Sequence, residues 1–176
     1  VEAMLLRAAG TQDPALRRAL ATVVVAGGGF TGVEFAGELA DRLPRMARRA
    51  GLARDEVRII TVEAMPDILP GFAEELIDAA VDALVRKGVS LLMGVPIVRV
   101  EPGRVWLADG QVIEAHTIIW AGGVRGNRVV AESLTSRGRG RAVVNAYLQS
   151  VDSPDVWCAG DCALAIDPST GRPVPP

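Results

Sequence analysis

Residues 23–37 read VVVAGGGFTGVEFAG, and this stretch decides the fold. The apolar, β-branched run that leads into it, 21–26, predicts a buried central strand of a parallel sheet. Three glycines follow at once, and apolar residues then recur at mixed spacings of three and four, as on the buried face of a helix. A strand that turns directly into a helix through glycines predicts an α/β fold.

The glycines also match a binding motif. Gly27, Gly29 and Gly32 have the G-x-G-x-x-G spacing of dinucleotide-binding proteins. The first glycine permits a tight turn, the second lets the backbone approach a pyrophosphate, and the third lets the helix pack close to the strand. The helix N-terminus adds free N–H groups and partial positive charge. The alternative is a glycine-rich corner that binds nothing. The expected ligand-contacting residues are Gly27, Gly28, Gly29, Phe30, Thr31 and Gly32.

An acidic residue ends the second predicted strand, 57–62. Glu63 stands where such folds place a carboxylate that accepts hydrogen bonds from the adenosine ribose hydroxyls. Its distance from the glycines exceeds the usual ~20 residues because the segment 44–55 intervenes. A carboxylate repels a 2′-phosphate, so we expect NADH to bind in preference to NADPH. The alternative is a solvated glutamate at a strand end.

The remaining pattern alternates strands and helices, then changes. Pro44 is expected to interrupt the first helix, which restarts in the arginine-rich segment and ends at Gly51. The alternation predicts a parallel sheet, and short strands separated by PG and DG turns predict an inserted three-stranded antiparallel β-meander. The expected ranges are a helix at 73–87, a strand at 89–93, meander strands at 97–101, 105–107 and 112–115, and further strands at 117–121, 142–148 and 156–159.

Composition limits the classes of function. With 176 residues, 49% of them hydrophobic, the chain is large enough to bury a core. The net charge of −2 argues against a nucleic-acid partner, and the basic run 45–54 is interpreted as a solvated helix face. No apolar run reaches the roughly 20 residues that cross a bilayer, and no signal-peptide pattern opens the chain. Because the chain starts without methionine and stops after GRPVPP, both ends are expected to be cuts through a longer protein.

Three residues that look reactive are assigned structural roles. Cys158 and Cys162 lack a second zinc-like pair and a basic neighbour, so they are interpreted as packing residues of a reduced protein. His116 is the only histidine and has no partner in the sequence pattern. No metal site is expected.

Four segments together resemble a known family. They are VVVAGGGFTGVEFAGELADRL, ITVEAMPDILP, TIIWAGGVRGN and DVWCAGDCA. They resemble the two-dinucleotide flavoproteins related to glutathione reductase and, within these, the type II NADH:quinone oxidoreductases. The resemblance implies a Rossmann-like FAD/NAD(P)-binding fold in which an NADH domain is inserted into an FAD domain. Residues 1–19 would then connect from a missing N-terminal FAD domain, residues 20–133 would form the NADH-binding domain, and residues 134–176 would return toward the FAD domain.

The resemblance also implies roles for individual residues. Glu34 matches a glutamate near the nicotinamide and flavin rings, although a glutamate in a first helical turn is favoured by the helix dipole in any case. Ala121, Gly122 and Gly123 match a turn that contacts NADH. Gly160 and Asp161 match a segment whose aspartate binds the FAD ribitol. For both segments the alternative is a simple turn.

The implied parent enzyme passes hydride from NADH to FAD and then electrons to a quinone in a respiratory chain. It would be cytoplasmic and peripheral on the inner face of the cell membrane, with homodimer formation left open. This chain alone is expected to bind NADH weakly, to hold no stable FAD and to reduce no quinone. Two alternatives remain: a soluble NADH-dependent reductase of ferredoxin, rubredoxin or a disulfide, and a non-catalytic NADH-sensing module.

Overall fold

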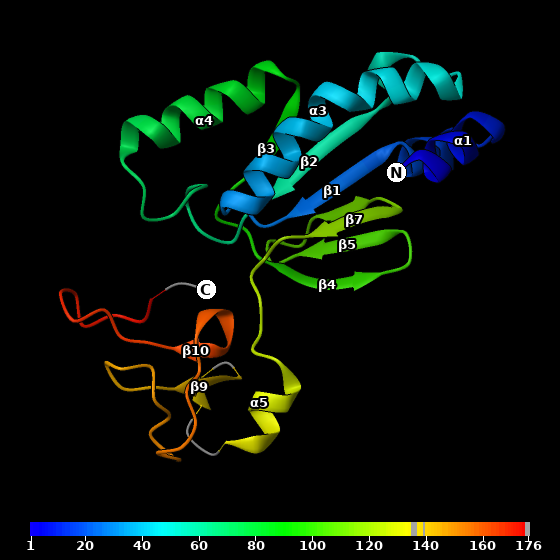
Figure 1. Ribbon diagram of the computed structural model, residues 1–176. Helices are drawn as coiled ribbons and strands as arrows, with labels where there is room; N and C mark the ends of the chain where they lie inside the picture. The colour runs from blue at the N-terminus through cyan, green and yellow to red at the C-terminus, as the bar shows by residue number, and fades with distance from the viewer. Residues whose placement is uncertain (135–136, 139, 175–176) are drawn as a thin grey trace. The chain divides into compact units, whose positions relative to one another are not determined.

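The structure, a computed structural model, describes residues 1–134, 137–138 and 140–174. The chain divides into two compact units, Val1–Gly122 (unit 1) and Gly123–Pro176 (unit 2) (Figure 1). The division falls inside the range 20–133 expected for the NADH-binding domain, and unit 1 also includes the first 19 residues. The functional roles assigned to the three expected ranges remain predictions.

Unit 1 contains a four-stranded sheet in the order β3-β2-β1-β7, and every neighbouring pair is parallel. Val24 at its centre pairs with Ile60 on one side and Ile118 on the other. The expected parallel sheet is therefore confirmed. The strands are β1 (Thr22–Ala26), β2 (Arg58–Val62), β3 (Val89–Leu92) and β7 (Thr117–Trp120).

Two apolar layers cover the two faces of this sheet. Val23 and Val25 pack with residues of α3 (Phe30–Ala50) and α4 (Glu74–Arg86). Val24 points the other way and packs with the antiparallel meander of β4 (Ile97–Glu101), β5 (Arg104–Leu107) and β6 (Val112–Glu114). Figure 1 shows the helices and the meander on opposite sides of the strands. The expected meander is confirmed. Cover on both faces agrees with the apolar sequence of β1 from Val23 to Ala26.

The helix after the glycines is longer than expected. α3 runs for 21 residues through Pro44 and ends at Gly51, whose φ of 85° supplies the left-handed C-cap. The predicted interruption at Pro44 is therefore wrong, whereas the predicted end is confirmed. Proline removes one N–H donor, but the helix stays continuous because Leu39 and Leu43 before it and Ala47 after it are buried in the core of unit 1.

Two short helices precede β1. α1 (Glu2–Gly10) was not expected. Residues 15–20 show a short helical pattern in the sequence, and α2 (Pro14–Leu20) confirms it. Arg17 ties both helices to unit 1, since it donates to the Ala8 carbonyl at 3.2 Å and to the Glu56 carboxylate at 2.5 Å. This ion pair lowers the pKa of the Glu56 carboxyl. Glu56 closes the short 3-10 helix η1 (Arg54–Glu56) that leads into β2.

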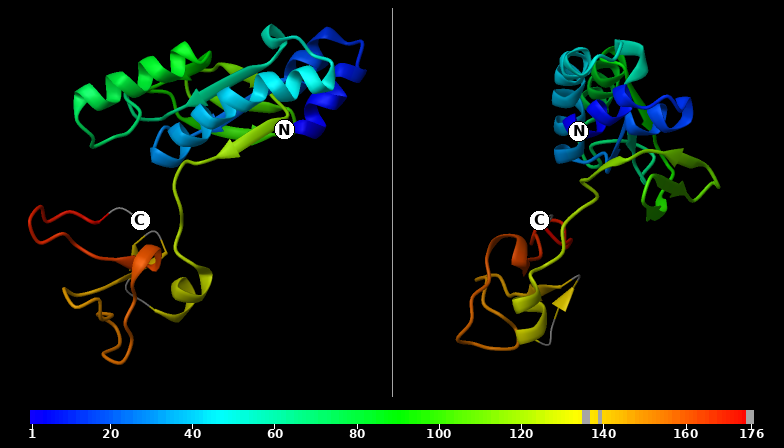
Figure 2. Two further views of the ribbon diagram at one scale, coloured as in Figure 1. Left: turned by 45° about the horizontal axis from the view of Figure 1, so that its top comes forward. Right: turned by 90° about the vertical axis from the view of Figure 1, so that its right-hand side faces the viewer.

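Unit 2 differs from its prediction. The expected strand at 142–148 shortens to β9 (Arg141–Val143). The expected strand at 156–159 is reduced to an isolated bridge between Trp157 and Gln149. β9 ends early because a turn follows it. The Asn145 side chain accepts hydrogen bonds from the Tyr147 and Gln149 N–H groups, and Leu148 has a φ of 61°. The other elements of unit 2 are α5 (Arg128–Ser133), β8 (Arg137–Gly138), η2 (Gly160–Cys162) and β10 (Ala163–Leu164), and Figure 2 shows them from two further sides.

The proline in α3 gives a test of this architecture. Pro44→Ala restores a helical N–H and removes the steric conflict with the preceding turn, so we expect the free energy of unfolding to rise by up to about 3 kcal/mol. Arg45→Ala, at the next and exposed position, is the control and should change it by less than about 0.5 kcal/mol. Urea unfolding followed by circular dichroism measures both. A destabilised Pro44→Ala would contradict a continuous helix.

Candidate dinucleotide-binding site

The glycine loop joins the end of β1 to the start of α3 with no room for side chains at Gly27 and Gly32. Gly27 has a φ of 113°, and a Cβ there would lie 2.5 Å from the Ala121 carbonyl oxygen. A Cβ on Gly32 would overlap the Gly27 carbonyl oxygen. These contacts bring the first turn of α3 directly onto the end of β1, which is the packing expected of the first and third glycines.

The N-terminus of α3 offers several hydrogen-bond donors. Val33 N–H closes the first helical bond to the Gly29 carbonyl at 3.0 Å. In the described part of the chain, the N–H groups of residues 29–32 have no hydrogen-bond acceptor, and Gly29 adds no side-chain cap. A Cβ on Gly29 would meet nothing within 4 Å, so this side of the loop is open. Free N–H groups on an open helix N-terminus suit an anion.

Glu63 lies beside this loop because β2 runs parallel to β1. Its Oε2 accepts from the Gly28 N–H at 2.5 Å, and its Oε1 accepts from the Met65 N–H at 2.7 Å. Each carboxylate oxygen has two lone-pair directions, so both oxygens retain acceptor capacity for ligand hydroxyls. The half-buried carboxylate therefore holds the loop and still presents acceptors at the edge of the sheet.

The end of β7 forms the third side of the site. Ala121 N–H donates to the Ala26 carbonyl at 2.7 Å, which places Ala121 behind the glycine loop. A Cβ on Gly122 would lie 3.3 Å from the Trp120 indole, whose side chain is 62% exposed. The TIIW pattern predicts a buried strand. Trp120 is instead exposed at the last position of β7, whereas the three residues before it in this edge strand are half-buried.

Glu34 needs one correction. It is the fifth residue of α3 and is exposed, and the first turn of this helix contains no acidic residue. The alternative explanation by the helix dipole, which acts within the first turn, is therefore wrong. The catalytic role of Glu34 remains a prediction.

The remaining predicted site residues lie in unit 2. Gly123 has a φ of 97° and Gly160 a φ of 71°, and both therefore serve as turn residues. Gly160 opens η2, in which Asp161 is exposed. Among the neighbouring thiols, Cys158 is buried and burial raises the pKa of its thiol, which disfavours the reactive thiolate.

Two residues that support the glycine loop escaped sequence reasoning. Ile68 is fully buried, and its Cγ2 lies 2.7 Å from the place that a Cβ on Gly28 would occupy. Leu69 N–H donates to the Gly28 carbonyl at 2.8 Å. An apolar pair before Pro70 carries no signal of this role, since the contact joins segments some forty residues apart.

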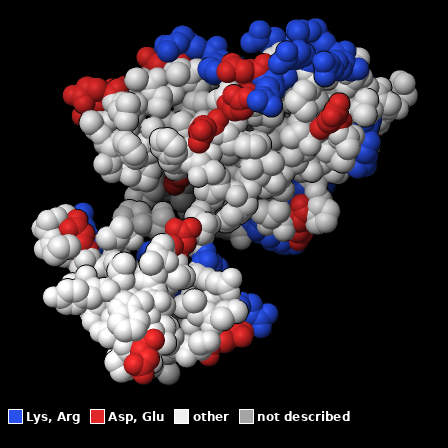
Figure 3. Space-filling model, viewed as in Figure 1, with Lys and Arg blue, Asp and Glu red and all other residues white. Residues whose placement is uncertain are grey.

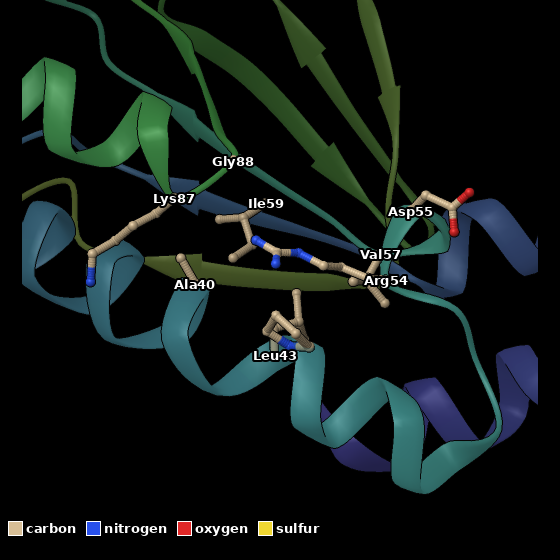
Figure 4. A pocket seen from close by; sticks show the side chains of 9 residues that line it. Ala40, Leu43, Arg54, Asp55, Val57, Ile59, Lys87 and Gly88 are labelled. Carbon is tan, nitrogen blue, oxygen red and sulfur yellow. The ribbon is translucent and has the colours of Figure 1, made fainter.

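A separate pocket lies at the opposite end of the sheet. It has a volume of about 410 Å³, and its walls come from α3, η1, the start of β2 and the end of α4 (Figure 4). Val57 and Gly88 immediately precede their strands and Ile59 is the second residue of β2, whereas the glycine loop and Glu63 follow the last residues of β1 and β2. The pocket is therefore not part of the dinucleotide site. Ligands of open α/β sheets bind at the carboxyl ends of the strands.

Comparison with known proteins agrees with this geometry. The sequence profile of the family described as "Pyridine nucleotide-disulphide oxidoreductase" matches residues 4–174. The chain belongs to this family. Two curated relatives are named type II NADH:quinone oxidoreductase. The protein of Staphylococcus saprophyticus is 42% identical over 156 residues, or 87% of this chain, and that of Staphylococcus aureus is 41% identical over 157 residues, or 88%. The chain spans only 39% of the length of each relative.

Two solved structures share the fold. An FAD-dependent pyridine nucleotide-disulphide oxidoreductase from Desulfovibrio vulgaris has a TM-score of 0.66 at 28% identity, and the match covers 88% of this chain and 38% of that one. The structure of NDH2 from Plasmodium falciparum in complex with NADH has a TM-score of 0.76 at 17% identity, and the match covers 91% of this chain and 36% of that one. The predicted Rossmann-like FAD/NAD(P)-binding fold is confirmed.

The close packing of the glycine loop can be tested within one helix. Gly32→Ala places a methyl group against the Gly27 carbonyl, so we expect it to lower the free energy of unfolding by at least about 2 kcal/mol. Gly37→Ala is the matched control, because its Cβ would meet only Leu84 at 3.8 Å. This control should gain about 0.5–1 kcal/mol of helix propensity. Equal effects of the two substitutions, measured by urea unfolding, would contradict the close approach.

Proposed function

We propose that this chain is the NADH-binding part of a flavin-dependent NADH:quinone oxidoreductase. The observation that carries the proposal is the open N-terminus of α3, with free N–H groups at residues 29–32, beside the Glu63 carboxylate. An anion-binding helix end and a hydroxyl-binding carboxylate at one sheet edge suit the pyrophosphate and the adenosine ribose of one dinucleotide. The names of the curated relatives support quinone as the final acceptor.

Each residue then has a defined task. The N–H groups after Gly28 bind the pyrophosphate without a cationic side chain, because the glycines let the backbone approach it. Glu63 accepts from the ribose 2′- and 3′-hydroxyls, and its negative charge disfavours a 2′-phosphate. The next three residues, Ala64, Met65 and Pro66, carry no cation that would offset this repulsion. NADH is therefore the preferred coenzyme.

The nicotinamide end is assigned to the other side of the loop. Glu34 projects from the exposed surface of α3, and Ala121 and Gly122 end the neighbouring strand β7. We assign Glu34 to the redox centre and the Ala121–Gly123 turn to NADH contact. FAD, when bound, supplies a two-electron acceptor, and Gly160 and Asp161 are the residues of unit 2 assigned to its ribitol. The main FAD-binding residues would lie in a separate N-terminal domain.

The proposed location follows from the proposed acceptor. A quinone dissolves in the bilayer, so the parent enzyme is assigned to the inner face of the cell membrane as a peripheral protein. None of the helices in the described ranges combines the length and the apolar character needed to cross a bilayer.

Figure 3 shows Lys and Arg side chains gathered on the helical side of unit 1, where Arg45, Arg48, Arg49 and Arg54 are exposed.

Coenzyme choice tests the role of Glu63. We expect the unmodified chain to bind NADH at least tenfold more tightly than NADPH in fluorescence titrations. Glu63→Gln should weaken NADH binding and narrow the NADH-to-NADPH ratio, because the neutral amide no longer repels a 2′-phosphate. Glu75→Gln, an equal charge change at an exposed position of α4, is the control. Equal affinities of the unmodified chain for both coenzymes would show the ribose assignment to be wrong.

The role of Glu34 needs the complete enzyme. In the full-length protein, we expect Glu34→Gln to reduce kcat for quinone reduction by about 10²-fold, in the range of a lost acid–base group, and to leave the Kd for NADH within about twofold. Glu38→Gln, one helical turn further along the exposed surface of α3, is the control. Unchanged turnover in Glu34→Gln would show that Glu34 has no catalytic role. A full-length protein that binds NADH but does not reduce quinone would favour an NADH-sensing module.

A further inference from the structure

We propose that Leu69, supported by Ile68, is a positioning residue of the pyrophosphate site. Its backbone N–H holds the Gly28 carbonyl, and this contact turns the Gly29 N–H toward the ligand. The inference rests on the proposed binding of NADH at the glycine loop. It assigns to the segment after β2 a task separate from the ribose contact of Glu63.

Both backbone groups of Gly28 are held by this one segment. The Gly28 N–H donates to Glu63 Oε2 at 2.5 Å, and the Gly28 carbonyl accepts from the Leu69 N–H at 2.8 Å. Ile68 fills the space beneath Gly28, where its Cγ2 would lie 2.7 Å from an added Cβ. Gly28 is therefore fixed in orientation by three contacts, although a glycine is the most conformationally free residue.

The geometry of the peptide bond passes this orientation to the next residue. In a trans peptide the carbonyl of one residue and the N–H of the next point in opposite directions, and the described chain contains no cis peptide. A Gly28 carbonyl that points at Leu69 therefore directs the Gly29 N–H away from Leu69. Within the described chain that N–H has no acceptor, and the space above Gly29 is open.

A flipped peptide would have the opposite effect on binding. If the Gly28–Gly29 peptide rotated by half a turn, a carbonyl oxygen would replace the N–H at the open side of the loop. An oxygen that carries partial negative charge repels a pyrophosphate, whereas an N–H binds it. Two adjacent glycines offer little resistance to such a rotation, so a fixed hydrogen bond on the carbonyl side is needed to prevent it.

The backbone of Leu69 is consistent with this task. Its φ of 50° is left-handed, a region that non-glycine residues adopt at a cost and that persists only where surrounding contacts enforce it. Ile68 provides such a contact because it is fully buried, and the Leu69 carbonyl accepts from the Phe72 N–H at 3.1 Å. The left-handed turn thus presents the Leu69 N–H to the glycine loop.

The test replaces the backbone N–H of residue 69 with an ester oxygen, and the same exchange at a second position controls for the other effects of an ester. An amide-to-ester exchange at position 69, introduced as L-leucic acid, deletes the donor and keeps the side chain. We expect the affinity for ADP-ribose to fall about tenfold and the affinity for adenosine to stay unchanged, because only ADP-ribose carries a pyrophosphate. Leu69→Gly keeps the N–H and favours a positive φ, so it should retain the affinity for ADP-ribose.

Leu148 provides the matched control. It is the other non-glycine residue with a positive φ in the described chain, and its N–H donates to the Asn145 carbonyl at 3.0 Å in unit 2. The same ester exchange at position 148 removes an equivalent turn hydrogen bond and should change neither affinity. A position-69 ester that binds ADP-ribose as the unmodified chain does would overturn the proposal. Equal losses for ADP-ribose and adenosine would also overturn it, since they would indicate a general loss of the fold.

A second readout separates this proposal from the proposed function. In the unmodified chain, NMR should detect a through-hydrogen-bond coupling between the Leu69 nitrogen and the Gly28 carbonyl carbon. Absence of this coupling would overturn the positioning role even if NADH binds. A chain that shows the coupling, but binds neither ADP-ribose nor inorganic pyrophosphate, would refute the dinucleotide site and with it the role of Leu69 in binding. The same spectra should show a shift of the Gly29 amide when pyrophosphate is added.

Discussion

The seating of Gly32 on the Gly27 carbonyl is the constraint on which the rest of unit 1 depends. Since no side chain fits between them, the first turn of α3 starts where β1 ends, and its free N–H groups lie at the edge of the sheet. Parallel pairing then brings the ends of the neighbouring strands to the same edge. Glu63 follows β2 and Ala121 follows β7, so both reach the glycine loop without any further device. One close contact and the parallel register therefore bring Glu63, Ala121 and the start of α3 together, and the segment after β2 then fixes the orientation of Gly28.

This site carries unfavourable features that the two apolar layers offset. Leu69 holds a left-handed backbone at a cost of about 1–2 kcal/mol, and the three consecutive glycines lose more conformational entropy on folding than other residues. Val23, Val24 and Val25 are almost fully buried, and each contributes roughly 1.5–3 kcal/mol relative to exposure. The burial of the central strand thus offsets the cost of the glycine loop and of the strained residue that supports it. The same burial explains why α3 continues through Pro44, since the loss of one hydrogen bond is small beside its long buried face.

The parts that were predictable from the sequence are those in which a local pattern has one structural solution. The apolar run into the glycines could only be a covered strand, and Glu63 had to follow the end of β2. The failures share a different cause. The continuity of α3 past Pro44 depends on burial against a sheet that is assembled from distant segments. The early end of β9 depends on the Asn145 side chain, which competes with the strand for backbone N–H groups. The support from Ile68 and Leu69 joins residues that no local pattern links.

The segment from Glu63 to Leu69 contributes both to recognition of the ribose and to the orientation of the glycine loop that binds the pyrophosphate. Glu63 acts on the ribose hydroxyls and also holds the Gly28 N–H, whereas Leu69 holds the carbonyl of the same glycine. A substitution at Glu63 therefore changes both the ribose contact and one of the contacts that orient the loop. A loss of NADH affinity in such a variant cannot be assigned to the ribose alone. The effect of the Glu63 charge is measured by the ratio of the affinities for NADH and NADPH. The effect of loop orientation is measured by comparing the affinities for ADP-ribose and adenosine, because only ADP-ribose carries a pyrophosphate. Specificity and positioning can therefore be separated even though one carboxylate serves both.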